Sequence, residues 1–162
     1  MRRTGKINRF IKRSLWIFHF NASGCNGCDI ELAAALTSRY DIERFGALLA
    51  PSPRHADALV VTGAVNRLTR DALKFIYDQV PEPKVVIALG TCACKGGVFA
   101  GCYNVAEGVD KVVPVDIYIP GCPPKPDAII EALAKIAGVK SEKTKKTMEV
   151  KESGSKEDRG ND

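Results

Sequence analysis

Four cysteines stand where their thiol groups could meet in the folded chain. Each follows shortly after an apolar segment of strand length: Cys25 and Cys28 after residues 15–20, Cys92 after residues 85–89, and Cys122 after residues 115–119. Because the carboxyl ends of parallel strands meet at one edge of an open sheet, we expect these thiols to converge there. Convergent thiols hold metal ions or iron–sulfur clusters, or they exchange disulfide bonds.

The donor set favours an iron–sulfur cluster over zinc or disulfides. Such clusters take four cysteine ligands, and a ligand followed by proline, as in Cys122-Pro123, is familiar from them. Structural zinc usually takes two closely spaced pairs. Here only Cys25 and Cys28 form such a pair, and no histidine stands beside any of the four cysteines. Disulfide bonds need an oxidising compartment, which nothing in the sequence indicates.

A redox-active dithiol is the sharpest rival to a cluster. Cys25 and Cys28, between a predicted strand and a predicted helix, also fit a thioredoxin-like site, where a helix N-terminus activates the thiol. This interpretation leaves Cys92 and Cys122 without a role. The spacing therefore favours a cluster and keeps a dithiol, a zinc site and unligated cysteines open.

The elements that must position these cysteines alternate between strands and helices. Short apolar runs predict strands, and apolar residues at spacings of three and four predict helices. Strands are expected over residues 15–20, 58–62, 85–89 and 115–119, with a weaker strand around 42–49, and helices over 29–38, 69–79 and 126–137. This order predicts an α/β fold, with an open, mostly parallel sheet and helices on both faces.

The glycines beside these cysteines, and the remaining cysteines and histidines, are expected to have structural rather than ligand roles. Six glycines flank the thiols, where backbone must turn tightly or approach a bulky inorganic ligand: Gly24, Gly27, Gly90, Gly96, Gly97 and Gly121. Cys94 and Cys102 lie outside the pattern and are expected to be spare thiols. His19 and His55 are expected to be structural.

Composition predicts one ordinary globular domain with two charged ends. The chain has 162 residues, with 24 Lys and Arg, 19 Asp and Glu, and 45% apolar residues. Residues 1–13 carry six bases and no acid and predict a basic amphipathic arm that docks onto partners near a membrane surface. Residues 139–162 mix seven bases with six acids and predict a disordered charged tail. The folded domain is expected over residues 14–138.

The sequence disfavours both a membrane-spanning helix and binding to nucleic acid. No apolar run approaches the roughly 18 residues of a membrane-spanning helix, so we expect an intracellular protein that does not cross a membrane. No zinc-finger spacing or helix-turn-helix pattern indicates nucleic-acid binding.

Four motifs, in this order, resemble a known family. They are similar to those of the small subunit of [NiFe] hydrogenases and its homologue in respiratory complex I, the 20 kDa subunit. The resemblance covers residues 14–137. The motifs are GCNGCDIE at residues 24–31, VTG at 61–63, LGTCACKGG at 89–97 and VPVDIYIPGCPP at 113–124.

The resemblance implies a flavodoxin-like domain that holds one proximal [4Fe–4S] cluster. Its ligands would be Cys25, Cys28, Cys92 and Cys122. Complex I homologues usually have two adjacent cysteines where this chain separates Cys25 and Cys28 by two residues, so the hydrogenase branch is favoured. The sequence has no second cysteine-rich domain, and it therefore resembles the short small subunit of a membrane-bound, energy-converting group 4 [NiFe] hydrogenase.

A function follows from this resemblance as an expectation. The chain would pass electrons from a ferredoxin-like multi-cluster subunit to the nickel–iron centre of the large subunit, which reduces protons to H2. Membrane-embedded subunits would couple this reaction to ion pumping, and the chain would lie peripherally on the cytoplasmic side of the cell membrane. The alternatives are the equivalent subunit of a complex I-like quinone oxidoreductase or polysulfide reductase and, outside the family, a thiol–disulfide oxidoreductase using Cys25 and Cys28.

Glu31 is the one candidate for proton chemistry. It lies three positions after Cys28, so on a helix the two side chains face about the same side. In the resemblance it matches a motif acid near the subunit interface, which implies proton transfer or interface polarity. The other interpretation is that Asp29 and Glu31 are helix-start acids stabilised by the helix dipole.

Overall fold

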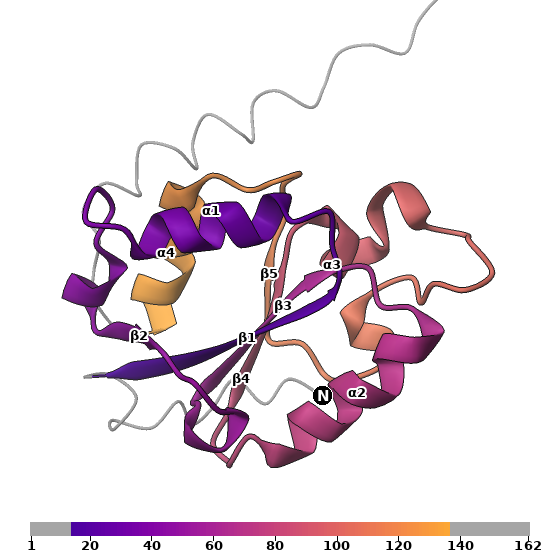
Figure 1. The fold of residues 1–162 in the computed structure, drawn as a ribbon, viewed down its shortest axis with the longest axis horizontal. Helices are drawn as coiled ribbons and strands as arrows, with labels where there is room; N and C mark the ends of the chain where they lie inside the picture. The colour runs from indigo at the N-terminus through magenta and orange to yellow at the C-terminus, as the bar shows by residue number, and fades with distance from the viewer. Residues whose placement is uncertain (1–13, 137–162) are drawn as a thin grey trace, which may run out of the picture.

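A sheet of five parallel strands forms the centre of the chain (Figure 1). The computed structural model describes residues 14–136. In that range the strands, in the order β2-β1-β3-β4-β5, are β1 (Leu15–Ser23), β2 (Ala47–Leu49), β3 (Ala58–Gly63), β4 (Val85–Leu89) and β5 (Ile117–Ile119). The chain steps outward from β1 to β2 and then returns to β3 on the other side of β1. Ligands of open α/β sheets bind beyond the carboxyl ends of the strands at such a reversal.

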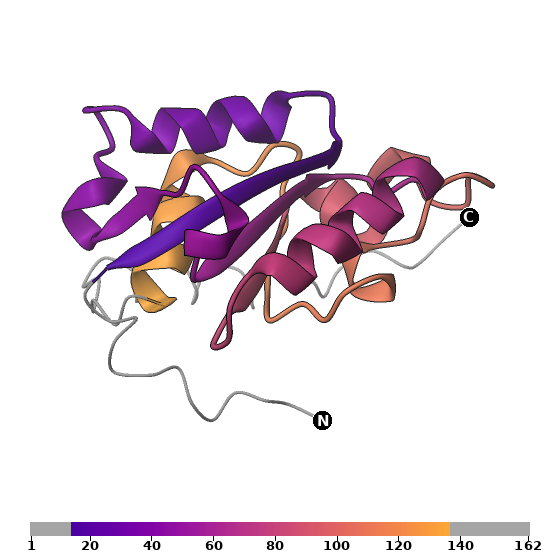
Figure 2. The same ribbon diagram turned by 60° about the horizontal axis from the view of Figure 1, so that its bottom comes forward.

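The α-helices of the described residues cover both faces of the sheet (Figure 2). α1 (Gly27–Leu36) and α4 (Pro126–Ile136) pack on one face, and α2 (Arg67–Gln79) and the short α3 (Thr91–Lys95) pack on the other. Short 3-10 turns connect some elements: Ile42–Phe45, Pro53–His55, Gly97–Phe99 and Val109–Lys111. The predicted α/β fold is confirmed, and every described strand pair is parallel.

Each face of the sheet has its own hydrophobic core because side chains alternate along a strand. On β4, Ile87 and Leu89 pack in one core with Leu133 of α4. Val86 and Ala88, which alternate with them along the strand, point to the opposite face and pack in the second core with Leu73 of α2. Burial on both faces explains why β3 and β4 are continuous apolar runs rather than alternating ones.

Two aspartates fix the amino ends of neighbouring strands. The Asp57 carboxylate, just before β3, accepts a hydrogen bond from the Trp16 N–H of β1 at 3.1 Å. The Asp116 carboxylate, just before β5, accepts one from the Val86 N–H of β4 at 2.9 Å. These bonds align strands at one end of the sheet, and the strand lengths then determine where each loop leaves the opposite edge.

Some predicted boundaries are wrong. The weaker strand expected around residues 42–49 fails over its first half: Ile42–Phe45 is a 3-10 turn, since Asp41 and Gly46 on either side adopt left-handed backbone. Only Ala47–Leu49 pairs with β1. The strand expected over 115–119 is confined to Ile117–Ile119, while β1 extends past its expected end to Ser23.

Helix starts differ from the predictions for local reasons. α2 begins at Arg67 because the Asn66 side chain accepts hydrogen bonds from the N–H groups of Leu68 and Thr69, at 2.9 and 2.8 Å. Thr69, expected to start the helix, is its third residue. α1 begins at Gly27, two residues earlier than expected, and α3 was not predicted at all.

Several expectations lie outside the described residues. These are the basic arm over residues 1–13, the charged tail over 139–162, and the last residues of the domain expected over 14–138. Within residues 14–136, no helix combines the length and the apolar character that a membrane span requires.

Candidate functional site

The four cysteines predicted as ligands all lie beyond the carboxyl ends of the strands. Cys25 is in the loop after β1, and Cys28 is the second residue of α1. Cys92 is the second residue of α3, directly after β4, and Cys122 is in the loop between β5 and α4. Strands β1, β4 and β5 therefore deliver thiols to the same edge of the sheet, as the sequence predicts.

Backbone hydrogen bonds join the two loops that carry Cys92 and Cys122. The Gly90 N–H donates to the Ile119 carbonyl oxygen at 2.8 Å. The Thr91 N–H and hydroxyl both donate to the Gly121 carbonyl oxygen, at 2.8 and 3.1 Å. Each cysteine directly follows a residue of this ladder, so the ladder holds the two residues side by side.

The thiols lie close enough to affect one another electrostatically. Burial raises the pKa of the Cys28 thiol to about 11, and negative charge on four neighbours adds to the effect: Cys25, Cys92, Asp29 and Cys122. Burial also raises the pKa of Cys92, with further contributions from Cys122 and Cys25. A group of thiolates that destabilise one another in this way is suited to cationic iron, which would compensate their charge.

Two glycines provide room around the sulfur atoms. A Cβ atom on Gly90 would lie 2.5 Å from the Cys28 Sγ, and a Cβ on Gly97 would lie 2.8 Å from the Cys92 Sγ. Both distances are shorter than any ordinary contact. The backbone therefore approaches these thiols as closely as it does only because side chains are missing.

The donor set fits a [4Fe–4S] cluster. Within residues 14–136, no three Cys, His, Asp or Glu side chains are grouped so as to hold a metal ion. A four-iron cluster does not need several side chains grouped around one ion, since each of its four irons takes one thiolate. Cys25 and Cys122 are exposed and Cys28 and Cys92 are half-buried, at the edge where the strands that precede them end.

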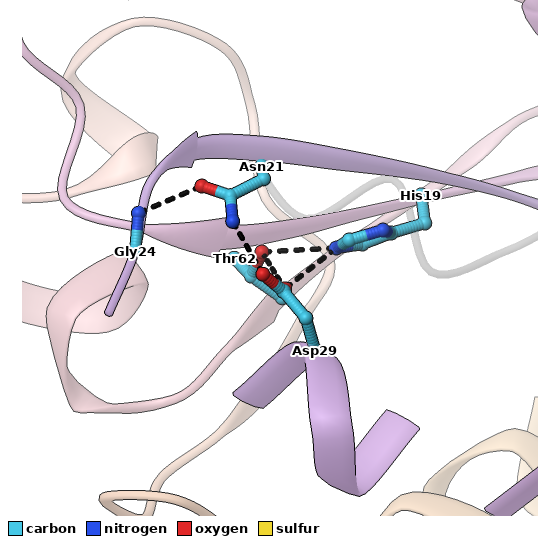
Figure 3. A network of polar contacts seen from close by, with 5 residues as sticks. All are labelled: His19, Asn21, Gly24, Asp29 and Thr62. Atoms are coloured by element: carbon cyan, nitrogen blue, oxygen red, sulfur yellow. Dashed lines mark hydrogen bonds and ion pairs between the residues drawn. The ribbon is translucent and has the colours of Figure 1, made fainter. Parts of the chain in front are cut away.

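A polar network lies beside this group of thiols and was not predicted (Figure 3). Asp29, the residue after Cys28, contacts His19 and Asn21 of β1 and Thr62 of β3. His19, expected to be structural, is thus part of the site's surroundings. The only feature of the sequence that could have indicated this role for His19 is its position on the predicted strand that leads to Cys25.

The remaining candidates lie near the edge without joining the thiols. Glu31 is half-buried on α1, one turn after Cys28. Cys94 is half-buried, and its Sγ lies 3.5 Å from the Ala88 carbonyl oxygen. It lines a groove of about 730 Å³ beside β5, and burial raises the pKa of its thiol. Cys102 and His55 are exposed on the surface.

Comparison with solved structures identifies the class of fold. One similar structure is a chain of the NAD+-reducing [NiFe]-hydrogenase in the H2-reduced state, with a TM-score of 0.61 and 20% sequence identity. The superposition covers 80% of this chain and 94% of the hydrogenase chain. The membrane-bound sulfane sulfur reductase, an archaeal respiratory membrane complex, has a chain with a TM-score of 0.69 and 40% identity, covering 80% of this chain and 71% of that chain. The fold is flavodoxin-like.

The chain belongs to the family described as NADH ubiquinone oxidoreductase, 20 Kd subunit, whose model matches residues 25–136. The family consists of subunits of oxidoreductase complexes, and its members are associated with iron–sulfur clusters. The residues that match include all four candidate ligands.

Relatives within the family carry different names. The probable membrane-bound hydrogenase subunit mbhJ of Pyrococcus furiosus is 49% identical over 84% of this chain and 84% of its own length. Formate hydrogenlyase subunit 7 of Escherichia coli is 47% identical over 82% of this chain, which spans 52% of that protein. An NADH-quinone oxidoreductase subunit of Geotalea uraniireducens is 44% identical over 82% of this chain and 75% of its own length.

Proposed function

We propose that this chain is the electron-transfer subunit of a membrane-bound [NiFe] hydrogenase and holds one proximal [4Fe–4S] cluster. The ligands are Cys25, Cys28, Cys92 and Cys122. The main support is that three separate strands deliver four thiols to one edge of the sheet, where Cys25, Cys92 and Cys122 lie close enough to Cys28 to add to the rise that burial causes in its pKa. When bound, the cluster supplies reversible one-electron transfer.

The chain's own residues position the ligands and shape their surroundings. The hydrogen bonds from Gly90 and Thr91 to the Ile119 and Gly121 carbonyls hold the loops of Cys92 and Cys122 together. Cys28 is half-buried, which limits the access of water to its sulfur atom. Burial and hydrogen bonding of this kind tune the reduction potential of such a centre.

Exposed apolar residues at the same edge support a partner subunit that covers it. Ile30 is 60% exposed on α1, just after Cys28, and Val98 and Tyr103 are 85% and 88% exposed in the segment after Cys92. Apolar surface concentrated beside a functional group usually marks an interface. We propose that the [NiFe]-type large subunit docks here, which would bring its metal centre next to the cluster.

We propose the wider assembly from the resemblance to membrane-bound [NiFe] hydrogenases, and the name of the mbhJ relative, a probable membrane-bound hydrogenase subunit, supports it. A ferredoxin-like multi-cluster subunit would deliver electrons, and membrane-embedded ion-translocating subunits would hold the complex on the cytoplasmic side of the cell membrane. Proton reduction to H2 would then be coupled to ion pumping. The second candidate is the equivalent subunit of a sulfane sulfur reductase, which is favoured by the 40% identity to a chain of that complex.

Metal analysis of the native complex tests the proposal. The complex containing this chain would be purified anaerobically from membranes, and iron, acid-labile sulfide, nickel and zinc would be measured per chain. We expect iron, sulfide and nickel together. Iron and sulfide without nickel would support the sulfur- or quinone-reducing relative instead, and zinc alone or no metal would overturn the cluster.

Replacing Glu31 by glutamine tests its proposed role in proton transfer. Glutamine keeps the size and removes the ionisable group, so we expect H2 evolution to fall by about tenfold or more, as for loss of a general acid or base, with unchanged iron content. Glu43→Gln, which changes an exposed acid in the 3-10 turn after α1, serves as the control. Equal turnover in both variants would make Glu31 a helix-start acid only.

A further inference from the structure

The carboxylate of Asp29 is held by three side chains from two strands (Figure 3). The Thr62 hydroxyl donates to Oδ1 at 2.6 Å, the His19 Nε2 lies 2.9 Å from the same oxygen, and the Asn21 amide donates to Oδ2. Thr62 is fully buried, and the Asp29 side chain is 15% exposed. Both carboxylate oxygens are therefore fixed from the strand side.

The chemistry of the groups gives the network one arrangement of hydrogens. A carboxylate only accepts hydrogen bonds, so the His19 Nε2 must carry the hydrogen that points at Asp29. The same nitrogen lies 2.9 Å from the Thr62 hydroxyl oxygen. Because the Thr62 hydrogen is already directed at Asp29, the threonine oxygen can accept, and the single Nε2 hydrogen of His19 is shared between that oxygen and the Asp29 carboxylate. All contacts to the carboxylate are then mutually compatible.

Asn21 connects the network to the loop that carries Cys25. Its Oδ1 accepts a hydrogen bond from the Gly24 N–H at 2.7 Å, while its Nδ2 donates to Asp29. One amide therefore links the residue before Cys25 to the residue after Cys28. The position of the carboxylate relative to this pair of cysteines is set by side chains rather than by the helix alone.

This arrangement goes beyond that of an ordinary helix-start acid. Such an acid is stabilised by the helix dipole and needs no partners on neighbouring strands. Asp29 instead has side-chain partners on β1 and β3, and it directly follows the proposed ligand Cys28 in the chain. The network therefore holds a charge at a defined place beside a proposed ligand.

We propose that Asp29, positioned by His19, Asn21 and Thr62, is a fixed negative charge that lowers the reduction potential of the cluster held at Cys28. The inference rests on the proposed function, since it requires the cluster. Reduction adds an electron, and adding negative charge beside a held carboxylate in a partly buried site is unfavourable. The charge thus makes the reduced cluster a stronger electron donor to its partner.

Redox titration of the purified complex, followed by the electron paramagnetic resonance signal of the reduced cluster, tests the inference. Asp29→Asn keeps the shape and an acceptor for Thr62 but removes the charge. We expect unchanged iron and sulfide content and a more positive potential. At a fixed potential the ratio of reduced to oxidised cluster should rise about tenfold, which is about 59 mV for one electron. Asp71→Asn, on the exposed side of α2, should leave the potential unchanged.

A second pair of variants keeps the test decisive if Asp29→Asn binds the cluster poorly. Thr62→Val removes one donor to the carboxylate and should shift the potential, whereas Thr62→Ser keeps the hydroxyl and should retain the wild-type value. A wild-type potential in Asp29→Asn, or in Thr62→Val when Asp29→Asn cannot be loaded, would overturn the inference and leave the proposed function standing. Absence of iron and sulfide from the wild-type complex would overturn the proposed function itself.

Discussion

A chain carrying Cys122→Ala is expected to fold normally and to lose the [4Fe–4S] cluster. Cys122 is exposed in the loop between β5 and α4, so its side chain contributes little to the hydrophobic cores. Its removal leaves three of four thiolates for a cluster that takes four. We expect the complex to lose about four irons and four acid-labile sulfides per chain, and to lose electron flow to the large subunit, with the same thermal unfolding as the cluster-free wild-type chain.

The chain provides a matched control for this variant. Cys102 is also an exposed cysteine, in the segment between the 3-10 turns Gly97–Phe99 and Val109–Lys111, and it lies outside the group of four thiols. Cys102→Ala should therefore keep full iron and sulfide content. If Cys122→Ala kept the cluster and the electron flow, the ligand set would be wrong. If activity needed only Cys25 and Cys28 and survived the loss of Cys92 and Cys122 together, a dithiol would replace the cluster.

Gly90→Ala is expected to damage the site from the backbone side. A Cβ at this position would lie 2.5 Å from the Cys28 Sγ, and the residue has a φ of +89°, where side chains are strained. The strain alone costs about 1–2 kcal/mol of folding free energy. The clash also forces Cys28 away from the other thiols, so we expect much less iron per chain as well as a lower unfolding temperature.

Gly101→Ala separates the two effects. Gly101 has a similar φ of +81°, but a Cβ there would meet nothing within 4 Å. This variant should lose a similar amount of stability, about 1–2 kcal/mol, and keep its iron. Equal iron loss in both variants would mean that general destabilisation, rather than displacement of Cys28, empties the site. Full iron content in Gly90→Ala would contradict the close packing of backbone against this thiol.

The sheet was predictable because its central strands are buried on both faces. β4 and most of β3 appear in the sequence as short runs of apolar residues, and in a globular domain such runs are typical of strands buried on both faces of a sheet. α3 was not predictable in the same way. It has five residues between glycines, and a helix that short shows no periodicity.

The approach of the cysteines to one edge was predictable from strand ends, but the network around Asp29 was not. Its members come from β1, β3 and α1, and Asn21 pairs with Thr62 only through the register of two parallel strands. Register depends on the packing of the whole sheet and on contacts such as that from Asp57 to Trp16. A single sequence specifies the composition of such a network without showing which members meet.

The position of β5 has a consequence for how the site is completed. β5 is a three-residue strand at the edge of the sheet, paired on one side with β4, and it leads directly to Cys122. Edge strands that short open locally at a lower free-energy cost than the central strands beside them. We therefore expect the segment that carries the fourth proposed ligand to open locally more readily than the central strands, which would provide a route for inserting a preformed inorganic group into an already folded chain.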